Sequence, residues 1–552
     1  MIGITEKLII KNGLIFDPIN DIEGEVKDIL IQDGVIVEKF SSENNVKEIN
    51  ASRKVVIPSA LDIHAHFASQ QVNWIRLLGT KNPKFQEVWK GLTFEKIARD
   101  YISNGYTFIL EANIFPSLTK QTIFNFKQIP ILDKAMLLNV SNFFPLELEF
   151  QKGKIEEMGT FLSDLLKITK GFGIKVYNPF ENEEWNFKIL REDLSKKGRL
   201  YNFSALDVYE NLTKANEYLG LPHSIHAHIE GYETEQAKKN LPLILEKINS
   251  LALRPNSKSN RSQIFHLAHA SSYNIDGDNR ELINLINTSE KFDLDIGIIA
   301  FNQINPLITS DRRLINQEID GSIDSNPYKL IRSAVEFEGD SFAMLRVFDK
   351  NNKRHCILWA NAIDLALNIK NKWKLQLSLN YPNYGDINSI PTIATLLLSN
   401  DARNKFMVGM NADKKEYDDN LTFNEYIIIS RSSPARSLGL GEIKGNLSVG
   451  ADGDVNILDI NLNEIDVSRD YEIVKNGLKN IEYVIKAGEI IKSHDKIDLN
   501  FQGKIFWSEG NSSREDTSLI MTKKKEFYRK YYSIFYDTLK ISVDDKYLRK
   551  ID

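Results

Sequence analysis

The histidines of this 552-residue chain are unevenly placed, since seven of the nine fall in three short clusters. The clusters are His64 and His66, then His223, His226 and His228, and finally His266 and His269. Histidine is the commonest side chain for binding a transition metal near neutral pH. The clusters lie about 160 and 40 residues apart, so a fold that joins them must bring distant segments together. We therefore expect several strand ends that meet at one metal site.

Strands and helices are predicted to alternate from residue 58 to about residue 415. The expected strands are TFILEA (107–112), IPILD (129–133), GIKVYN (173–178), SIHAHI (224–229), IFHLAH (264–269), LDIGIIAF (294–301) and LQLSLN (375–380). Longer amphipathic segments, such as FEKIARDYISNG and LDVYENLTKANEYLG, lie between these runs and predict helices. Such alternation favours a parallel α/β sheet, and the number of repeats suits a closed (β/α)8 barrel over residues 58–415.

Both ends of the barrel segment are flanked by a pattern typical of short strands. In residues 1–57, Asn12-Gly13 and Asp33-Gly34 stand between apolar runs and predict tight hairpin turns. In residues 416–500, KGNLSVGADGDVNILDI and IEYVIKAGEII predict short strands with glycine turns. We expect these two segments to pair in one small composite β domain beside the barrel.

Residues 501–552 are expected to form a C-terminal extension. The segment KKKEFYRKYYSIFYDTLK predicts a helix with an aromatic face. We expect this face to pack on its own chain, and docking to a partner is the alternative.

The composition excludes several classes of function. The formal net charge of −5 gives no electrostatic case for binding nucleic acid or an anionic membrane surface. The single cysteine, Cys356, excludes an internal disulfide and a four-cysteine iron–sulfur cluster within the chain. The first residues lack the apolar core of a secretion signal and the chain lacks an apolar run of transmembrane length, so we expect neither a secretion signal nor a transmembrane helix. We expect a cytoplasmic protein.

The spacing within the histidine clusters suits metal binding. Alternation along a strand places His64 and His66 on one face, and the same holds for His226 and His228 in SIHAHI. A buried neutral histidine with satisfied hydrogen bonds is the ordinary explanation for any one of them. The whole set favours a metal site, and histidine-rich sites favour zinc, with iron, nickel and manganese as alternatives.

Lys175 ends the predicted strand GIKVYN inside the expected barrel. A buried ammonium beside metal cations would be repelled and poorly solvated. The amine is compatible with metals if it has added carbon dioxide, because the carbamate is an anion that can bridge two ions. The alternative is a lysine paired with an acidic residue at the barrel mouth.

Taken together, these residues resemble the amidohydrolase superfamily. The family has an HxH motif after the first barrel strand, a carbamylated lysine after the fourth, and histidines after the fifth and sixth. Here DIHAHF, GIKVYN, LPHSIHAHIE and FHLAHASS match these elements. PARSLGLGEIKGNLSVGADGDVNILD resembles the return of the family's chain into its composite β domain.

The resemblance is closer to one branch of the family. LIIKNGLIFDPINDIEGEVKDILIQDGVIVE, ITKGFGIKVYNP, LGLPHSIHAH and the NYPN segment are similar to the A subunits of formylmethanofuran dehydrogenase and of the bacterial formyltransferase/hydrolase complex. This similarity spans roughly residues 5 to 460.

The resemblance implies a site with two divalent metal ions, zinc in the first place. His64 and His66 would hold one ion, and Lys175, carboxylated by CO2, would bridge both. His269 and one histidine of SIHAHI would hold the second ion. The family pattern points to His226, and His228 on the same face is the alternative. His266 is expected to line the barrel without binding metal.

One position departs from the family pattern. Asn380, in LSLNYPN, stands where the family has an aspartate after the eighth strand. An aspartate can take up and deliver a proton, whereas a neutral amide cannot do so at neutral pH. Asp386 and Glu111 are the candidates for a replacement carboxylate. The segment after Lys175, PFENEEWNF, also departs from the glycine-rich stretch of the family.

The function implied by the resemblance is hydrolysis, or formation, of the formyl amide of a methanofuran-type one-carbon carrier, in which formylmethanofuran and water give formate and methanofuran. The implied partners are companion subunits of a formyltransferase/hydrolase or formylmethanofuran dehydrogenase complex, which would hold any redox cofactors. One alternative is a catalytically weakened structural component of such a complex, which Asn380 favours. Another is a dihydropyrimidinase-like cyclic amidohydrolase.

Overall fold

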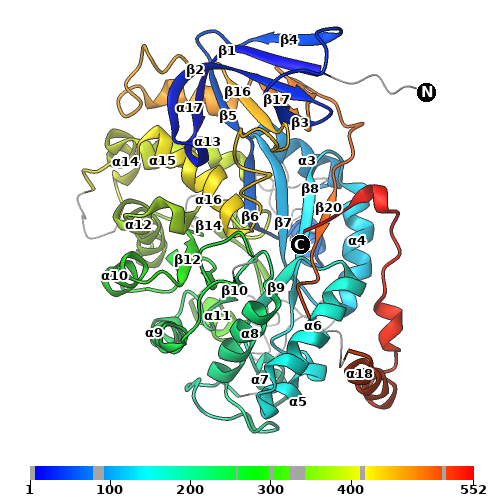
Figure 1. Ribbon diagram of the computed structural model, residues 1–552. Coiled ribbons are helices and arrows are strands. Elements are labelled where there is room, and N and C mark those ends of the chain that lie inside the picture. The colour runs from blue at the N-terminus through cyan, green and yellow to red at the C-terminus, as the bar shows by residue number, and fades with distance from the viewer. Residues whose placement is uncertain are drawn as a thin grey trace.

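The computed structural model describes residues 7–78, 92–187, 189–256, 259–297, 304–321, 342–410, 417–512 and 517–551. A helix-covered parallel barrel forms the larger part, and a mixed sheet lies against one end of it (Figure 1). None of the helices in these ranges is long and apolar enough to cross a membrane.

Eight parallel strands form a nearly closed (β/α)8 barrel, which confirms the predicted fold class. In spatial order they are β6 (Ala60–Ala65), β7 (Tyr106–Ile114), β8 (Asp133–Asn139), β9 (Gly173–Tyr177), β10 (Ile225–His228), β11 (Phe265–Leu267), β12 (Phe292–Asp295) and β15 (Leu375–Gln376). The segment after β15 returns to β6, because the Ser378 hydroxyl donates to the His64 carbonyl at 2.8 Å and the His66 amide donates to the Tyr381 carbonyl at 2.7 Å.

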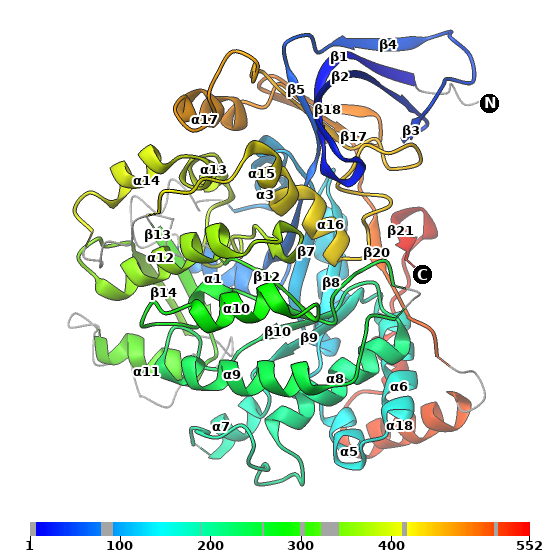
Figure 2. The same cartoon turned by 60° about the vertical axis from the view of Figure 1, so that its left-hand side comes forward.

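Helices cover the outside of the barrel (Figure 2). The longer ones are α3 (Phe94–Ser103), α4 (Thr119–Gln128), α6 (Ile155–Thr169), α8 (Ala205–Leu219), α9 (Glu235–Ser250), α10 (Arg280–Thr288), α11 (Arg312–Gly321), α12 (Lys353–Asn368) and α13 (Ile390–Leu398). Helix α8 shows why they form where they do. A reciprocal capping box of Ser204 and Asp207 begins it, and Gly220 ends it in the left-handed region at φ 62°.

Further helices lie elsewhere along the chain. They are α1 (Gln71–Leu78), α5 (Phe144–Lys152), α7 (Glu181–Phe187), α14 (Asn400–Met407), α15 (Phe423–Ile427), α16 (Ser433–Ser437) and α17 (Tyr471–Lys479). β13 (Ile304–Thr309) and β14 (Phe342–Val347) pair antiparallel in a two-stranded sheet apart from the barrel sheet.

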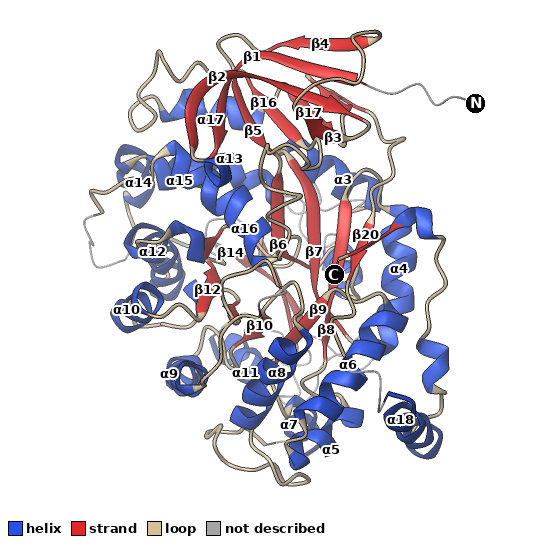
Figure 3. Ribbon diagram, viewed as in Figure 1, coloured by secondary structure: helices blue, strands red, loops and turns tan. Residues whose placement is uncertain are grey.

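Both flanking segments of the chain form one further sheet, as predicted (Figure 3). The first segment supplies β1 (Lys7–Asp17), β2 (Ile22–Gln32), β3 (Val35–Val37), β4 (Val46–Asn50) and β5 (Val55–Pro58). The second supplies β16 (Val455–Leu458), β17 (Tyr483–Lys486), β18 (Glu489–Ser493) and β19 (Lys496–Ile497). The two segments join where β16 pairs antiparallel with β5.

Of the two predicted hairpin turns, one is present in the structure and the other is not. Asp33-Gly34 joins β2 to β3, and both residues have positive φ, 53° and 84°. Asn12-Gly13 is not a turn and lies inside β1, where the pairing with β2 shifts register. Asn12 has a φ of 59°, so the local preference for positive φ is satisfied by a bulge within a long strand.

Three predicted barrel strands differ in their limits. The segment 129–133 precedes its strand, because Pro130 lacks an amide donor and Ile131 has a φ of 66°; the strand itself is β8. In 375–380 only Leu375 and Gln376 belong to the ladder. Strand β12 starts before the predicted 294 and ends at Asp295, and residues 298–301 of that prediction lie outside the described residues.

The C-terminal extension packs on the barrel. Strand β20 (Ile505–Trp507) pairs with β8 and with β21 (Leu548–Lys550). Helix α18 (Thr517–Tyr531) lies against α5 and α6, with Phe527 contacting Phe144 at a ring distance of 5.0 Å and Lys524 paired with Glu149 at 2.6 Å. The aromatic helix therefore packs on its own chain, as expected.

Candidate metal centre and the cavities beside it

A small cavity of about 20 Å³ lies at the carboxyl ends of the barrel strands. Its lining residues are His64, His66, Gln71, Asn113, Lys175, Tyr177, His228, Tyr232, His269, Ile308, Asn380, Asn383 and Tyr384. Strands far apart in sequence thus bring five of the six predicted metal residues to one place, together with Asn380. His226, the sixth, is not part of the lining.

The four histidines of the cavity are close enough to share metal ions. The ring of His64 lies 4.1 Å from that of His269 and 5.4 Å from that of His66, and the ring of His228 lies 5.5 Å from that of His269. Burial lowers the pKa values of His64, His228 and His269. A lowered pKa keeps the imidazole neutral, which is the form that binds metal.

Strand register places His226 and His228 at different depths. His226 pairs with Lys175 on β9 and with His266 on β11, whereas His228 pairs with Tyr177 one layer nearer the cavity. Both ring nitrogens of His226 are engaged, with Nε2 2.9 Å from His64 Nδ1 and Nδ1 3.0 Å from His223 Nε2. The Nδ1 atom of His228 is buried and has no hydrogen bond within the described chain. A free ring nitrogen at the cavity makes His228 the better ligand candidate.

Buried carboxylates face the Nδ1 atoms of the other three cavity histidines. Glu111 Oε1 lies 3.2 Å from His66 Nδ1, and the two oxygens of Asp295 lie 3.5 Å from His64 Nδ1 and from His269 Nδ1. The Glu111 carboxylate on Nδ1 of His66 fixes the orientation of that ring and leaves its Nε2 for a metal. The donor set therefore fits a metal centre.

Asp295, at the end of β12, was not among the predicted site residues. Its carboxylate accepts from the His269 backbone amide at 3.1 Å, and ligand atoms of His64, His269 and Asp295 lie within 4.8 Å of one another. The cluster is able to hold a metal ion. The available signal was an acidic residue within the apolar run LDIGIIAF, but nothing in that run shows which histidines it meets.

His266 lies inside the barrel, away from the cavity lining. Its Nδ1 is 3.0 Å from Asp293 and its Nε2 is 3.2 Å from Asp295. Burial lowers its pKa, but the two carboxylates outweigh burial and raise the pKa of His266 to about 9. A protonated ring between two acids has no lone pair for a metal.

Lys175 is fully buried, and its Nζ atom has no hydrogen-bond partner within the described chain. Burial lowers the pKa of the Lys175 amine to about 7, although Asp295 opposes the shift. A neutral amine is the form that adds carbon dioxide. The position of this unpartnered atom fits a carbamate, in which the nitrogen no longer carries a positive charge that needs a buried partner.

The candidate replacement carboxylates do not line the cavity. Glu111 is used by His66 and by the backbone amides of Ala68 and Ser69, at 2.7 and 3.1 Å. Asp386 caps the short 3-10 helix at Ile387–Ser389. Asn380 itself is in place, with a φ of 58° and a buried Oδ1 that has no hydrogen bond within the described chain.

The segment PFENEEWNF, which departs from the family pattern, forms α7 beside the cavity. Glu184 pairs with Arg313 at 2.9 Å, and Glu183 accepts from the backbone amides of Arg199 and Leu200. Burial raises the pKa of Glu181 to about 8. Glu183 and Glu184 therefore hold local structure, and none of the three glutamates is part of the cavity lining.

A second cavity of about 250 Å³ adjoins the first and shares Gln71, Asn113 and Tyr177 with it. Its other lining residues are Ala68, Ser69, Gln70, Ile114, Phe115, Ser117, Leu118, Gln121, Thr122, Thr309 and Ser310.

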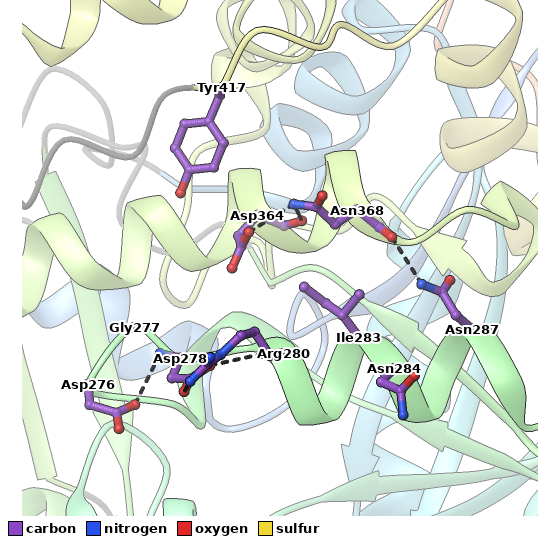
Figure 4. A pocket seen from close by; sticks show the side chains of 10 residues that line it. All are labelled: Asp276, Gly277, Asp278, Arg280, Ile283, Asn284, Asn287, Asp364, Asn368 and Tyr417. Carbon is purple, nitrogen blue, oxygen red and sulfur yellow. Dashed lines mark hydrogen bonds and ion pairs between the residues drawn. The ribbon is translucent and has the colours of Figure 1, made fainter.

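A larger hollow of about 670 Å³ lies between α10 and α12 and has no histidine in its lining (Figure 4). Its polar groups bond one another: Arg280 pairs with Asp278 at 2.6 Å, and Asn287 donates to the Asn368 carbonyl at 3.1 Å. This hollow is larger than the histidine cavity, but it lacks the metal-binding side chains that the histidine cavity has.

Comparisons with known proteins agree with the geometry. The model of the Amidohydrolase family matches residues 341–492. Protein FwdA of Methanocaldococcus jannaschii is 29% identical over 97% of this chain and 96% of its own length. The A subunit of the formyltransferase/hydrolase complex Fhc of Methylorubrum extorquens is 24% identical over 87% of this chain and 89% of its own length.

The fold has a counterpart among solved structures. The crystal structure of the formyltransferase/hydrolase complex (FhcABCD) from Methylorubrum extorquens with methylofuran matches with a TM-score of 0.83, 21% identity and coverage of 99% of both chains. The predicted resemblance to the amidohydrolases, and to this branch of them, is confirmed.

Proposed function

We propose that this chain, an amidohydrolase-type relative of FwdA and of the Fhc A subunit, is the corresponding component of a formyltransferase/hydrolase or formylmethanofuran dehydrogenase complex. Its reaction is the hydrolysis, or the formation, of the formyl amide of a methanofuran-type carrier. The amide and water give formate and the free amine. The observation that carries the proposal is one cavity lined by four histidines, a buried unpartnered lysine and the asparagine of the NYPN segment.

The residues that would hold two divalent metals are His64, His66, Lys175 as its carbamate, His228 and His269. His228 replaces the family-based choice of His226, because both ring nitrogens of His226 are already engaged. Bound divalent ions would polarise the formyl oxygen and activate water, and zinc is the ion we expect first. Glu111 would keep Nε2 of His66 directed at the metals, and the Asp295 carboxylate lies 3.5 Å from Nδ1 of His64 and of His269.

Asn380 decides how fast this site works. Its amide can orient the formyl group or a water through hydrogen bonds, but it cannot carry a proton to the leaving nitrogen. Loss of general acid–base assistance costs about a hundred- to ten-thousandfold in rate. We therefore expect slow hydrolysis by the wild-type chain.

A weakened structural component of the complex is the second candidate. The observation in its favour is that no aspartate or glutamate lines the histidine cavity among the described residues. In this case the metals stabilise the fold, and the chain chiefly positions companion subunits. Any redox step would lie on those subunits, because Cys356 is the only cysteine of this chain.

Formate release separates the two candidates. Purified chain, loaded with zinc and bicarbonate, is assayed for formate from an N-formyl amine beside Asn380→Asp and Lys175→Met. The enzyme proposal expects slow release by wild type, faster release by Asn380→Asp and none by Lys175→Met. No release by wild type with full metal content, and release restored by Asn380→Asp, would favour the structural role. His494→Gln, at an exposed histidine, is the matched control and should behave as wild type.

A further inference from the structure

The C-terminal helix α18 buries one face and presents large aromatic side chains outside it. The buried face packs on α5 and α6 and consists of Ile520, Met521, Lys524 and Tyr528. Tyr531, in the last turn of the helix, is 55% exposed, and Phe535, four residues further on, is 63% exposed. Apolar side chains of this size gain stability only when they leave water. The packing of the helix on its own chain therefore does not account for these two side chains.

The exposed side chains belong to one aromatic patch, which we define as Phe144, Phe527, Tyr531, Ile534 and Phe535. Phe527 and Tyr531 both contact Phe144 of α5, at ring distances of 5.0 and 5.8 Å, and their own rings lie 4.7 Å apart. Large exposed apolar patches mark interaction sites on soluble proteins. Aromatic side chains also supply much of the binding energy at protein interfaces. The patch therefore has the composition of a docking surface.

Basic side chains border the aromatic patch. Helix α18 holds five basic residues and one acidic residue, Glu526. Arg529 and Lys530, in its last turn, are exposed and have no ion pair within the described chain. The Lys530 ammonium lies 5.0 Å from the centre of the Tyr531 ring, so the charge and the aromatic surface are adjacent. A partner that docks here needs acidic groups around its apolar contact.

A second copy of this chain is a poor occupant for the surface. Symmetric contact between two identical patches would place Arg529 and Lys530 of one copy near the same residues of the other. Like charges that face each other across an interface weaken binding, and a different protein with an acidic face avoids this cost. The matched chain of the FhcABCD structure covers 99% of this chain, the extension included. A chain with this fold therefore works inside a complex of different subunits.

We propose that the aromatic patch and its basic border are the surface through which this chain docks on a companion subunit. The contact face of that subunit combines an apolar hollow, which receives Tyr531 and Phe535, with acidic side chains that pair with Arg529 and Lys530. The inference rests on the proposed function, which makes the chain a component of a complex. It goes beyond that function by assigning the contact to α18, to the residues that follow it and to the start of α5.

Affinity for companion subunits tests the aromatic part of the surface. The probe is the source organism's counterparts of the B, C and D subunits of FhcABCD, purified without this chain and titrated by biolayer interferometry with the full-length chain. Tyr531→Ala and Phe535→Ala should each weaken binding at least about tenfold. Ile473→Ala is the matched control and should bind as wild type, because Ile473 is 48% exposed on α17, at the opposite end of the molecule (Figure 1).

Charge reversal and salt test the basic border. Arg529→Glu combined with Lys530→Glu should weaken binding at least about tenfold, because two attractions become repulsions. Wild-type affinity should fall between about 50 and about 500 mM NaCl, and the double variant should depend less on salt. Lys479→Glu, at an exposed lysine in the last turn of α17, is the control. Unchanged unfolding temperatures show that each variant is folded.

The outcomes separate this inference from the proposed function. Wild-type affinity in every patch variant would overturn the inference and leave the proposed function standing. No binding of the wild-type chain to the companion subunits would contradict the proposed function and, with it, this inference. The same variants are compared without companion subunits by light scattering and by sedimentation with phosphatidylserine vesicles. A dimer or a vesicle complex that the patch variants lose, while they keep wild-type affinity for the companion subunits, would also overturn the inference.

Discussion

His226 and His228 lie two residues apart on one strand, yet their surroundings differ. His226 is held by His64 and His223 within the barrel, while His228 presents an unpartnered nitrogen at the cavity. The first environment suits a structural histidine, and the second suits a ligand. The family pattern points to the deeper of the two, because alternation places both side chains on the same face and only strand register separates their depths.

Substitution of each histidine by glutamine tests this distinction. We expect His228→Gln to lower zinc affinity by at least about tenfold while the unfolding temperature of the metal-free protein changes little. His226→Gln should instead lower the unfolding temperature, because it leaves His64 and His223 without a buried partner. Metal content after dialysis and thermal unfolding are the measurements, with His494→Gln as control. Equal metal loss in both variants would contradict the assignment.

We expect Glu181 to make the free energy of unfolding depend on pH. Burial raises its pKa from 4.5 to about 8, so the folded state binds a proton that the unfolded state releases. The contribution is complete below pH about 4.5 and is lost as the pH rises through about 8. The free energy of unfolding of wild type should fall with pH across this window more steeply than that of Glu181→Gln, by at most about 1.4 kcal/mol per pH unit. The free energy of unfolding is measured by urea unfolding at several pH values. If it falls equally with pH in wild type and Glu181→Gln, Glu181 is not the cause of the pH dependence.

At the scale of elements, periodicity predicted the helices because each buries one face, and continuous apolar runs predicted most barrel strands because these are buried on both faces. The sequence-based prediction was wrong where two different backbone structures satisfy the same local preference. Asn12-Gly13 prefers positive φ, and both a hairpin turn and a bulge satisfy that preference. Contacts between different elements could not be predicted from the sequence. Asp295, for example, lies beside His64 and His269 only because their strands come together in the folded barrel.

A buried charge cluster joins the composite sheet to the barrel. Lys486 of β17 lies 2.6 Å from Asp133 of β8 and 2.9 Å from Asp454, and Lys444 lies 2.7 Å from Asp133. Removing one partner leaves an uncompensated buried charge. Lys486→Met should therefore destabilise the protein by about 3–5 kcal/mol.

The control for this cluster is Lys475→Met on the surface of α17. Its partner Glu472 is 4.0 Å away and exposed, so the expected change is below about 1 kcal/mol. Chemical unfolding of both variants is the measurement. A loss for Lys486→Met no larger than that for Lys475→Met would mean that the cluster does not couple the two parts.

At the scale of the whole molecule, the composite sheet and the histidine cavity lie at opposite ends of the barrel. Strand β6 begins at Ala60, directly after β5 of the composite sheet ends at Pro58. The sheet therefore adjoins the amino ends of the barrel strands (Figure 1). The carboxyl ends, where active sites of this fold lie, remain available for substrate and for the companion subunits that we propose.

We propose that Lys175, as a carbamate, shares two metal ions with His64, His66, His228 and His269. The most direct test is the ¹³C NMR spectrum and zinc content of protein prepared with zinc and ¹³C-bicarbonate. We predict a protein-bound carbamate signal and two zinc ions per chain in wild type, and loss of the signal and of at least one ion in Lys175→Met. Two zinc ions retained by Lys175→Met, with no carbamate signal in wild type, would contradict the claim.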